Sequence, residues 1–406
     1  MIAEVLFFAA LMGVGSVFLL YRLVLSLTPR RVRSQTGATP EFLEGEDLPT
    51  VTGIIAVRNA VGLVDMKVRN CLALDYPPGK LSFIFYSDGS TDGTTERLRE
   101  WAAREETIHV MASTTHGGKI AALNEAAREC SSDLLLFTDV DALLAPDSLR
   151  LLARHYSDES VGGVCGRRVI GEEDAEVRSG QDRHFRFHAG VQALESQVGS
   201  VTANEGKIYI MRRDLFEPIA ASVTDDLYTS LCVVRRGFRF IYEPDAVAHV
   251  HLPSRSLAHE ITRRRRIVST SLRGLWHQRG LFNPFRYGVY SLGLFINKVL
   301  RRLLPVFLTV LFVSSAALAE HFLFFSVLAL QCVFYLGAIT HMVLPRMTRR
   351  IPIVGKLLAV VAYFCVGNVG MLLGLLDFVG GRSIDRWEPV KGEESDSPRE
   401  RPPVEH

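Results

Sequence analysis

Apolar residues gather at the two ends of the chain and leave a mixed stretch between them. Residues 5–26 are almost wholly apolar and match the roughly 20 residues that a membrane-spanning helix needs. Three more apolar runs follow near the other end, at 303–318, 322–344 and 353–379. The pattern therefore predicts one N-terminal span and three later ones. The first of the later runs is short for a full crossing.

The middle of the chain alternates between short apolar runs and amphipathic stretches. Runs rich in β-branched or large apolar residues at 51–57, 81–86 and 134–137 predict buried strands, and helical patterns occupy 91–104 and 118–130. Strands that alternate with helices predict an α/β fold with a mostly parallel sheet. Ligands bind at the carboxyl ends of the strands in such sheets.

These patterns divide the chain into six predicted parts. They are a transmembrane anchor at 1–27, a linker at 28–48, an α/β domain at 49–280, a basic interfacial segment at 281–302, three spans within 303–380, and a polar tail at 381–406. Arginines follow the first span and separate the last two, which predicts that both places face the cytoplasm. Because no basic residue precedes the first apolar run, we expect an uncleaved anchor there. The side of the tail stays open.

Charge and cysteine content exclude several classes of protein. The 46 Lys and Arg nearly balance the 44 Asp and Glu, so the chain is no acidic or basic tail protein. Six scattered cysteines fit neither a zinc site nor a disulfide framework. Residues 255–302 contain eleven basic residues and one acid, together with aromatics, just before the later spans. This composition predicts a segment at the membrane surface and no nucleic-acid partner.

Candidate chemistry lies where the predicted strands end. Asp139 and Asp141 follow the strand at 134–137, where two carboxylates can bind a hard cation such as Mg²⁺ or Mn²⁺. Taken alone, the pair could equally be a solvated loop. Asp88 lies in an acidic, glycine-rich turn after the strand at 81–86 and can accept hydrogen bonds from a base or ribose. Two glycines before Lys119 predict an anion site at a helix N-terminus. Their spacing is not that of a P-loop, which disfavours ATP hydrolysis.

The ordered motifs resemble those of the family 2 glycosyltransferases, inverting GT-A enzymes that use nucleotide-diphosphate sugars. The motifs cover about residues 50–270 and, with membrane segments on both sides, resemble the branch of the cellulose, hyaluronan and poly-N-acetylglucosamine synthases and the ceramide glucosyltransferases. In chain order they are Arg58-Asn59, Asp88–Thr94, Gly118-Lys119 with Ala122-Leu123-Asn124, Asp139–Asp141, Asn204–Arg213, Thr224–Asp226, Gly237–Arg239 and Tyr242–Pro244.

The resemblance implies a Rossmann-like GT-A domain and a role for each matching residue. Asp88 would contact the uracil or ribose, with Asn59 beside the nucleotide, and Lys119 would contact the nucleotide or diphosphate. Asp139 would lie near the ribose and metal, with Asp141 on the Mg²⁺ or Mn²⁺. Asp226 would be the general base, with Asp225 the less favoured candidate; a helix N-cap is the structural alternative for this pair.

Several positions depart from the pattern of the family. Ala56, Ala60 and Ser87 replace its usual Pro, Glu and first Asp. Arg263 and Arg266 match the membrane synthases' Q-x-x-R-W or R-x-x-R-W motif, and Ile267 replaces its Trp. Arg266 could hold the diphosphate, although four consecutive arginines can also be a solvated or phospholipid-facing patch.

Two features stay open at this stage. Without the Trp, an aromatic platform for a growing chain would have to come from elsewhere, such as Trp276 or Tyr209. His249 and His251 would share one face of a strand, where one of them could be a metal ligand.

The sequence therefore predicts a multi-pass protein of the plasma or inner membrane with a cytoplasmic catalytic domain. We expect it to transfer a sugar from a UDP-sugar to a lipid, lipid-linked or saccharide acceptor, with inversion to a β-linkage. The loss of the Trp favours one or a few additions. A processive polysaccharide synthase is the alternative, and a non-catalytic membrane scaffold is a remote one. The sugar, the linkage position and the oligomeric state stay open.

Overall fold

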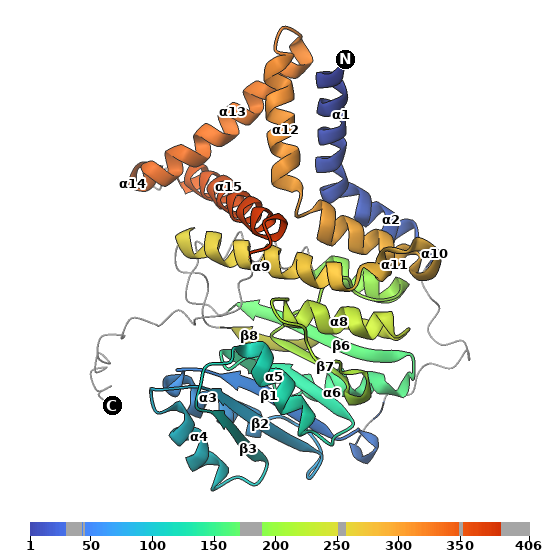
Figure 1. The fold of residues 1–406 in the computed structure, drawn as a ribbon, viewed down its shortest axis with the longest axis vertical. Helices are drawn as coiled ribbons and strands as arrows, with labels where there is room; N and C mark the ends of the chain where they lie inside the picture. The colour runs from blue at the N-terminus through green and yellow to red at the C-terminus, as the bar shows by residue number, and fades with distance from the viewer. Residues whose placement is uncertain (30–42, 44, 171–188, 251–256, 349–351, 383–406) are drawn as a thin grey trace, which may run out of the picture.

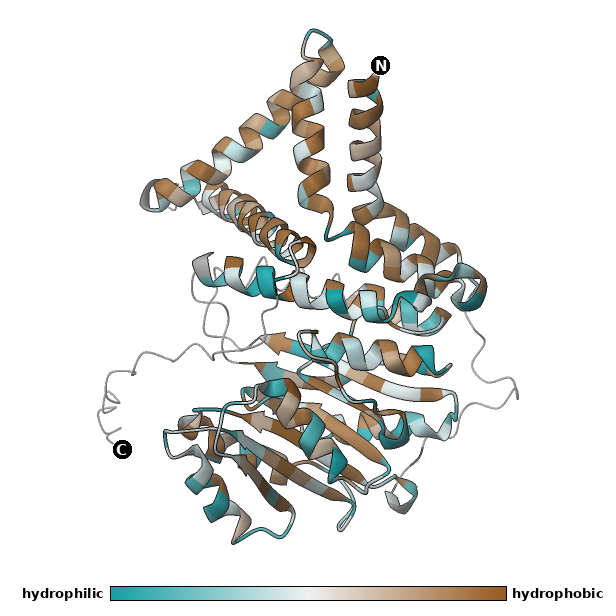
Figure 2. Ribbon diagram, in the orientation of Figure 1, coloured by the Kyte–Doolittle hydropathy of each residue, from teal (hydrophilic) through white to brown (hydrophobic). Residues whose placement is uncertain are grey.

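The molecule separates into a sheet domain at one end and a group of apolar helices at the other, with one long amphipathic helix between them (Figure 1). The computed structural model describes residues 1–29, 43, 45–170, 189–250, 257–348 and 352–382. Colouring by hydropathy shows that the apolar helices are brown along most of their length, whereas the sheet domain has polar helices over apolar strands (Figure 2). This division matches the distribution of apolar residues along the chain.

A mixed eight-stranded sheet forms the centre of the sheet domain. Its order is β3-β2-β1-β4-β7-β6-β8-β5. The first four strands in this order pair in parallel, as do β6 and β8, whereas β7 runs antiparallel to both of its neighbours and β5 runs antiparallel to β8. The strands are β1 (Val51–Val57), β2 (Leu81–Asp88), β3 (Ile108–Ser113), β4 (Leu134–Thr138), β5 (Ala142–Leu144), β6 (Val161–Ile170), β7 (Ile208–Arg212) and β8 (Arg239–Val250).

Helices cover both faces of this sheet, which explains why β1 and β4 are apolar at nearly every position. One hydrophobic cluster joins Ile54, Leu135 and Phe137 to α5 and α8, and a second joins Val51 and Ile55 to α3, α4 and α6. The helices are α3 (Val61–Leu72), α4 (Thr94–Ala102), α5 (Lys119–Arg128), α6 (Ser148–Ala153) and α8 (Asp225–Arg235). The three expected strands, both expected helices and the mostly parallel α/β sheet are confirmed.

A 21-residue helix, α9 (Leu257–His277), lies between the sheet domain and the apolar helices (Figure 1). The chain then forms the short helices α10 (Pro284–Tyr287), α11 (Val289–Leu294) and the π-helical turn η6 (Phe295–Leu300). The predicted interfacial segment at 281–302 therefore covers only the second part of this layer. The helix that separates the two ends of the molecule begins earlier, at residue 257.

Within the described residues, three helices are long and apolar enough to cross a membrane: Ile2–Leu27, Phe322–Val343 and Ile353–Val379. They contain α1 (Ile2–Gly15) with α2 (Tyr21–Leu27), α13 (Phe322–Val343) and α15 (Pro352–Val379). The expected span at 303–318 forms α12 (Leu304–Ala317), whose 14 residues reach only about 21 Å, less than the ~30 Å hydrocarbon layer. It follows Val289–Leu300 after a 63° bend, so these two helices cross only as one broken unit. The number of spans stays a prediction.

Helices α9 and α15 pack together closely enough for their backbones to touch. A Cβ at Gly374 would lie 2.4 Å from the Arg265 carbonyl oxygen, and one at Gly370 would lie 2.9 Å from the Ile261 carbonyl oxygen. Arg265 Nε also donates to Asp377 Oδ2 of α15 at 2.5 Å. Because only glycine permits this approach, α9 is fixed to an apolar helix along one side. Its other side packs on the sheet domain, where Thr270 hydrogen-bonds Thr224.

Candidate active site

The two carboxylates after β4 converge on a lysine that the sequence-based prediction had not included. Lys207 Nζ lies 2.9 Å from Asp139 Oδ2 and 2.7 and 2.9 Å from the two Asp141 oxygens. The pairing of β4 with antiparallel β7 explains this contact, since Ile208 is opposite Thr138 and the residues just outside the ladder meet. Lys207 was not identified because strand pairing is not visible in a single sequence.

A second lysine joins this pair to the first turn of α8. Lys119 Nζ, at the start of α5, lies 2.9 Å from Asp139 Oδ1 and 2.8 Å from Asp225 Oδ2. Burial opposes ionisation of these groups, but the ammonium groups of Lys119 and Lys207 hold the pKa of Asp139 far below its usual value, and the carboxylates raise the pKa of Lys119. The site is therefore a charged network of two cations and three carboxylates.

Asp226 differs from its neighbour Asp225 because its carboxyl group forms no ion pair within the described part of the chain. Burial and the negative charge of Asp225 raise the pKa of Asp226 to about 7. Its Oδ1 accepts a hydrogen bond from the Leu227 amide at 2.6 Å, and its other oxygen faces Gly206, where a Cβ would lie 2.5 Å from Oδ2. A carboxyl group with a pKa near the working pH is suited to general-base catalysis.

Asp88 and Asn59 hydrogen-bond the chain itself in this structure. Asp88 accepts from the Gly117 amide at 2.7 Å and the Gly118 amide at 2.9 Å, with His116 Nδ1 at 2.7 Å. The Asp88 carboxylate thus accepts hydrogen bonds from the backbone amides at the start of α5, where the sequence predicts an anion site. Asn59 Oδ1 likewise accepts from the Thr91 amide at 2.9 Å and holds the turn after β2.

The four consecutive arginines of α9 point in different directions, since successive helical residues are about 100° apart. Arg263 and Arg264 pair with Glu260, while Arg265 pairs with Asp377. Burial lowers the pKa of Arg266, whose charge is also influenced by Asp225, Arg263 and Asp139, so this arginine lies close to the acidic network. The arginine run therefore combines structural pairs with one cation at the candidate site.

A buried lysine that the sequence analysis did not identify supports the turn at Asp139. Lys67 of α3 has no exposed surface, and its Nζ donates to Thr138 Oγ1 at 3.1 Å and to the Ala142 carbonyl at 2.5 Å. It thereby joins the residue before the two carboxylates to the residue after them. A single charged residue on the otherwise apolar helix face of Val64, Val68 and Cys71 was the available signal.

The residues present fit a divalent cation bound through two carboxylates. Asp139 and Asp141 already direct three oxygens at one ammonium group, and Mg²⁺ commonly binds through one or two carboxylates plus substrate phosphates. Among the described residues, no group of three His, Cys, Asp or Glu side chains converges on one point. His249 is exposed on β8, and His251 lies outside the described residues. The remaining ligands would therefore come from the donor and water.

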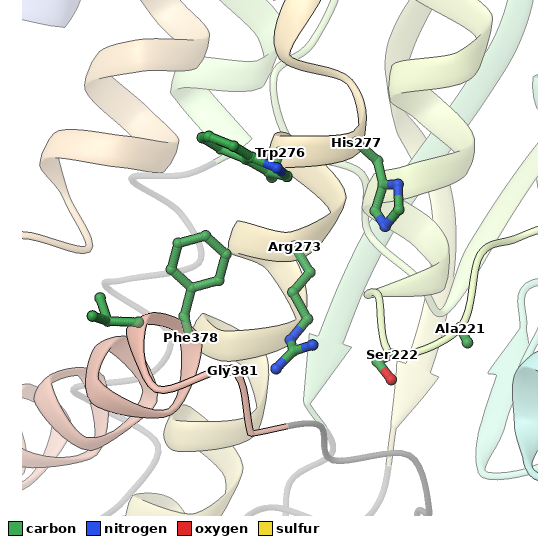
Figure 3. Close-up of a pocket in the computed structure, with 8 residues that line it drawn as sticks. Ala221, Ser222, Arg273, Trp276, His277, Phe378 and Gly381 are labelled. Carbon is green, nitrogen blue, oxygen red and sulfur yellow. The ribbon is translucent and has the colours of Figure 1, made fainter.

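A cavity of about 450 Å³ lies between the ends of α9 and α15 (Figure 3). Arg273, Trp276 and His277 of α9 line it together with Ser222 and Phe378. The Trp276 side chain is 64% exposed. The other aromatic candidate for a platform is excluded, because Tyr209 is buried in the core and stacks on Phe137 with ring centroids 4.9 Å apart.

Comparisons with known proteins agree with this geometry. Residues 54–219 match the family model described as Glycosyl transferase family 2. The chain is 23% identical over 256 residues to a poly-β-1,6-N-acetyl-D-glucosamine synthase of Staphylococcus aureus, covering 62% of this chain and 57% of that protein. It is 26% identical over 187 residues to a β-monoglucosyldiacylglycerol synthase of a Nostoc species, covering 44% and 40%. The matches thus span less than two thirds of either relative.

A solved structure gives the fold independently. The mannosyltransferase of Pyrobaculum calidifontis, in complex with GDP-Man and Mn²⁺, superposes with a TM-score of 0.64 at 22% identity, covering 94% of this chain and all of that one. This likeness establishes the GT-A architecture of the sheet domain. Together with the family match over β1 to the segment before α8, it confirms the resemblance drawn from the motifs. Residues 54–219 therefore form a family 2 glycosyltransferase domain, and the sheet domain that contains them has a GT-A fold.

Proposed function

We propose that this enzyme transfers one or a few sugars from a UDP-sugar to a lipid or lipid-linked acceptor at the membrane, with inversion and with Asp226 as the base. The observation that carries the proposal is the chain of contacts from Asp141 through Lys207, Asp139 and Lys119 to Asp225. It connects the carboxylates suited to a donor with Asp225, the residue next to the proposed base. A transferase needs both groups in one site.

In the proposed step, Asp226 accepts the proton of the acceptor hydroxyl as that oxygen bonds to the anomeric carbon. The bond from that carbon to the diphosphate breaks on the opposite side, and UDP leaves with the electron pair. Lys119, Lys207 and Arg266 supply positive charge toward the departing diphosphate. A bound Mg²⁺ or Mn²⁺, held by Asp139 and Asp141, would neutralise the same charge.

The composition of the site supports a nucleotide-sugar donor and a divalent cation. The Pyrobaculum relative was solved with a nucleotide sugar and Mn²⁺, which supports a divalent cation for this chain as well. Lys207 must leave the two carboxylates when a cation binds between them, because both occupy the same point. Its ammonium group is then available to the diphosphate. We propose a UDP-sugar as the donor, with Mg²⁺ and Mn²⁺ both able to serve.

The two candidate functions differ in the acceptor that receives the sugar. One relative is named as a polysaccharide synthase and the other as a glycolipid synthase. Ile267 in place of Trp favours release after one or a few additions, since an aliphatic side chain gives less contact with a sugar ring. The exposed Trp276 favours the second candidate, a processive synthase, because it offers an aromatic face on the wall of the cavity.

Purified protein in nanodiscs, given a panel of UDP-sugars and a lipid extract, tests the proposal through UDP release. Wild type is expected to release UDP with one sugar and to stop in EDTA. Asp141→Asn should lose most activity and keep its fold, whereas Asp245→Asn, an exposed carboxylate elsewhere, should behave as wild type. Turnover that persists undiminished in EDTA would reject the metal. No UDP release with any donor would favour a scaffold, and long product ladders would favour the synthase.

A further inference from the structure

Three cationic side chains lie at the bend between η6 and α12 without an acidic partner. They are Lys298, Arg301 and Arg302, and none of them forms an ion pair within the part of the chain that the structure describes. Arg302 is only 8% exposed, and its guanidinium donates to neutral groups: Nε to Ser271 Oγ at 2.8 Å and Nη1 to the Lys298 carbonyl at 2.6 Å. Buried cations without a counter-charge are costly, so an anion is expected here.

This cluster lies between the candidate base and the apolar helices. Lys298 is within electrostatic reach of Asp226, and Arg301 is within reach of Arg264 on α9. The contact of Arg302 with Ser271 fixes the bend against α9, on the side of the sheet domain facing the helices (Figure 1). An acceptor that reaches Asp226 from a membrane would therefore pass this bend.

The acids nearest to the cluster are committed to other contacts. Glu195 Oε1 accepts from Tyr21 Oη at 2.5 Å, from Thr202 Oγ1 at 2.6 Å and from Asn297 Nδ2 at 3.2 Å, and burial raises its pKa. Asp226 accepts a hydrogen bond from the Leu227 amide. Neither carboxyl group forms an ion pair with the three cations within the described part of the chain, so the bend carries an excess of positive charge.

We infer that Lys298, Arg301 and Arg302 bind a phosphate group of a membrane lipid and that this lipid is the acceptor. The inference rests on the proposed function and narrows its acceptor to lipids that carry phosphate in the headgroup. The O–H of that headgroup, either an alcohol or the P–OH of a monophosphate, gives its proton to Asp226. Its oxygen then bonds to the anomeric carbon while UDP leaves. The donor diphosphate is a separate anion, which Lys119, Lys207 and Arg266 would bind together with the cation that Asp139 and Asp141 would hold.

Lipid retention tests the binding site without turnover. Full-length protein in mild detergent is mixed with phosphatidylglycerol, polyprenyl monophosphate or diacylglycerol, and bound lipid is counted by native mass spectrometry. Wild type is expected to retain a phosphate-bearing lipid and not diacylglycerol. Arg301→Gln and Lys298→Gln should each weaken retention about fivefold. Arg286→Gln, an exposed arginine of the same basic stretch, should not. Equal retention in all variants would overturn the inference.

Transfer assays in nanodiscs then distinguish phosphatidylglycerol from polyprenyl monophosphate as the acceptor. They also test the lipid site separately from the proposed transferase activity. Labelled sugar on phosphatidylglycerol or on polyprenyl monophosphate identifies which lipid accepts it, and Arg301→Gln should raise the KM for that lipid while UDP affinity stays unchanged. Transfer to diacylglycerol alone would overturn the inference and keep the proposed function. Weaker UDP binding in Arg301→Gln would assign the cluster to the donor and overturn it too. Lipid retention without any UDP release would overturn the proposed function and leave only a lipid site.

Discussion

Replacing Asp225 by Asn is expected to move the acid limb of the pH–rate profile to lower pH. Asp226 must be ionised to accept a proton, and its pKa is raised to about 7 by burial and by the neighbouring charge of Asp225. In wild type the rate should therefore be flat above this pKa and fall as the pH drops below it. Removing the neighbouring charge favours the ionised form, so the limb shifts toward acid.

The size of the shift follows from the charges around Asp226. Two unit charges about 6 Å apart at an effective dielectric constant of about 20 interact by roughly 3 kcal/mol, which corresponds to a pKa change of about 2. The ion pair of Asp225 with Lys119 offsets part of this repulsion in wild type. In Asp225→Asn this ion pair is lost, so the charge of the Lys119 ammonium is no longer balanced by Asp225 and lowers the pKa of Asp226 further. Both effects have the same sign, and the expected shift is about 1 to 2 pH units.

UDP release at saturating donor and acceptor, measured from about pH 5 to 9, gives the limb directly. Asp225→Asn is compared with wild type, with Asp226→Asn and with the exposed control Asp245→Asn. Loss of the base in Asp226→Asn should cost about 10²–10⁴-fold in rate, and UDP binding should stay near normal. Asp225→Asn should cost less. An acid limb that does not move in Asp225→Asn, or a larger rate loss there than in Asp226→Asn, would refute the assignment.

Three further outcomes are expected. Between the ordinary carboxyl pKa near 4 and a pH of about 7, folded Asp226 keeps a proton that the unfolded chain releases, so the stability of wild type falls as the pH rises. The melting temperature of Asp226→Asn should therefore exceed that of wild type at pH 8 and not at pH 4. A difference in melting temperature that is the same at both pH values would contradict this. Gly206→Ala puts a Cβ 2.5 Å from Asp226 Oδ2, so turnover should drop while UDP affinity and circular dichroism stay as in wild type; full turnover would show that the carboxyl position is unimportant. Ile267→Trp should lengthen the products on a gel if an indole retains the acceptor, and a long ladder from wild type would instead establish the synthase.

The strands that the sequence predicts are those whose apolar runs are continuous. Val51–Val57 and Leu134–Thr138 are covered by helices on both faces, so nearly every position is apolar and the run is visible without knowledge of its partners. Tyr209 belongs to β7, whose antiparallel insertion between β4 and β6 depends on contacts distant in sequence. The sequence shows the residues of this strand but not its neighbours.

The same limit applies to the site. Asp139 and Asp141 could be proposed because they follow a recognisable strand, and Asp226 could be proposed because its Thr-Asp-Asp motif resembles that of the family. Lys207 could not, since its role depends on the β4–β7 pairing. The contacts of Asp88 were also hidden, because they require residues 116–118 to fold back onto the turn after β2. Gly89 permits this approach, with φ of +61° and a Cβ that would lie 2.8 Å from the His116 amide nitrogen.

If α15 crosses a bilayer, its close contact with α9 would link catalysis to the physical state of that bilayer. The two helices meet at Gly370 and Gly374 and are tied by Arg265 and Asp377, so a change in the inclination of α15 would move α9 with it. Arg266 follows Arg265 in α9 and lies close enough to Asp225 and Asp139 for their charges to act on it. A helix adjusts its inclination when the hydrocarbon layer becomes thinner or thicker than its apolar length. Turnover in vesicles of graded acyl-chain length should therefore pass through an optimum, at the hydrocarbon thickness that matches the apolar length of α15.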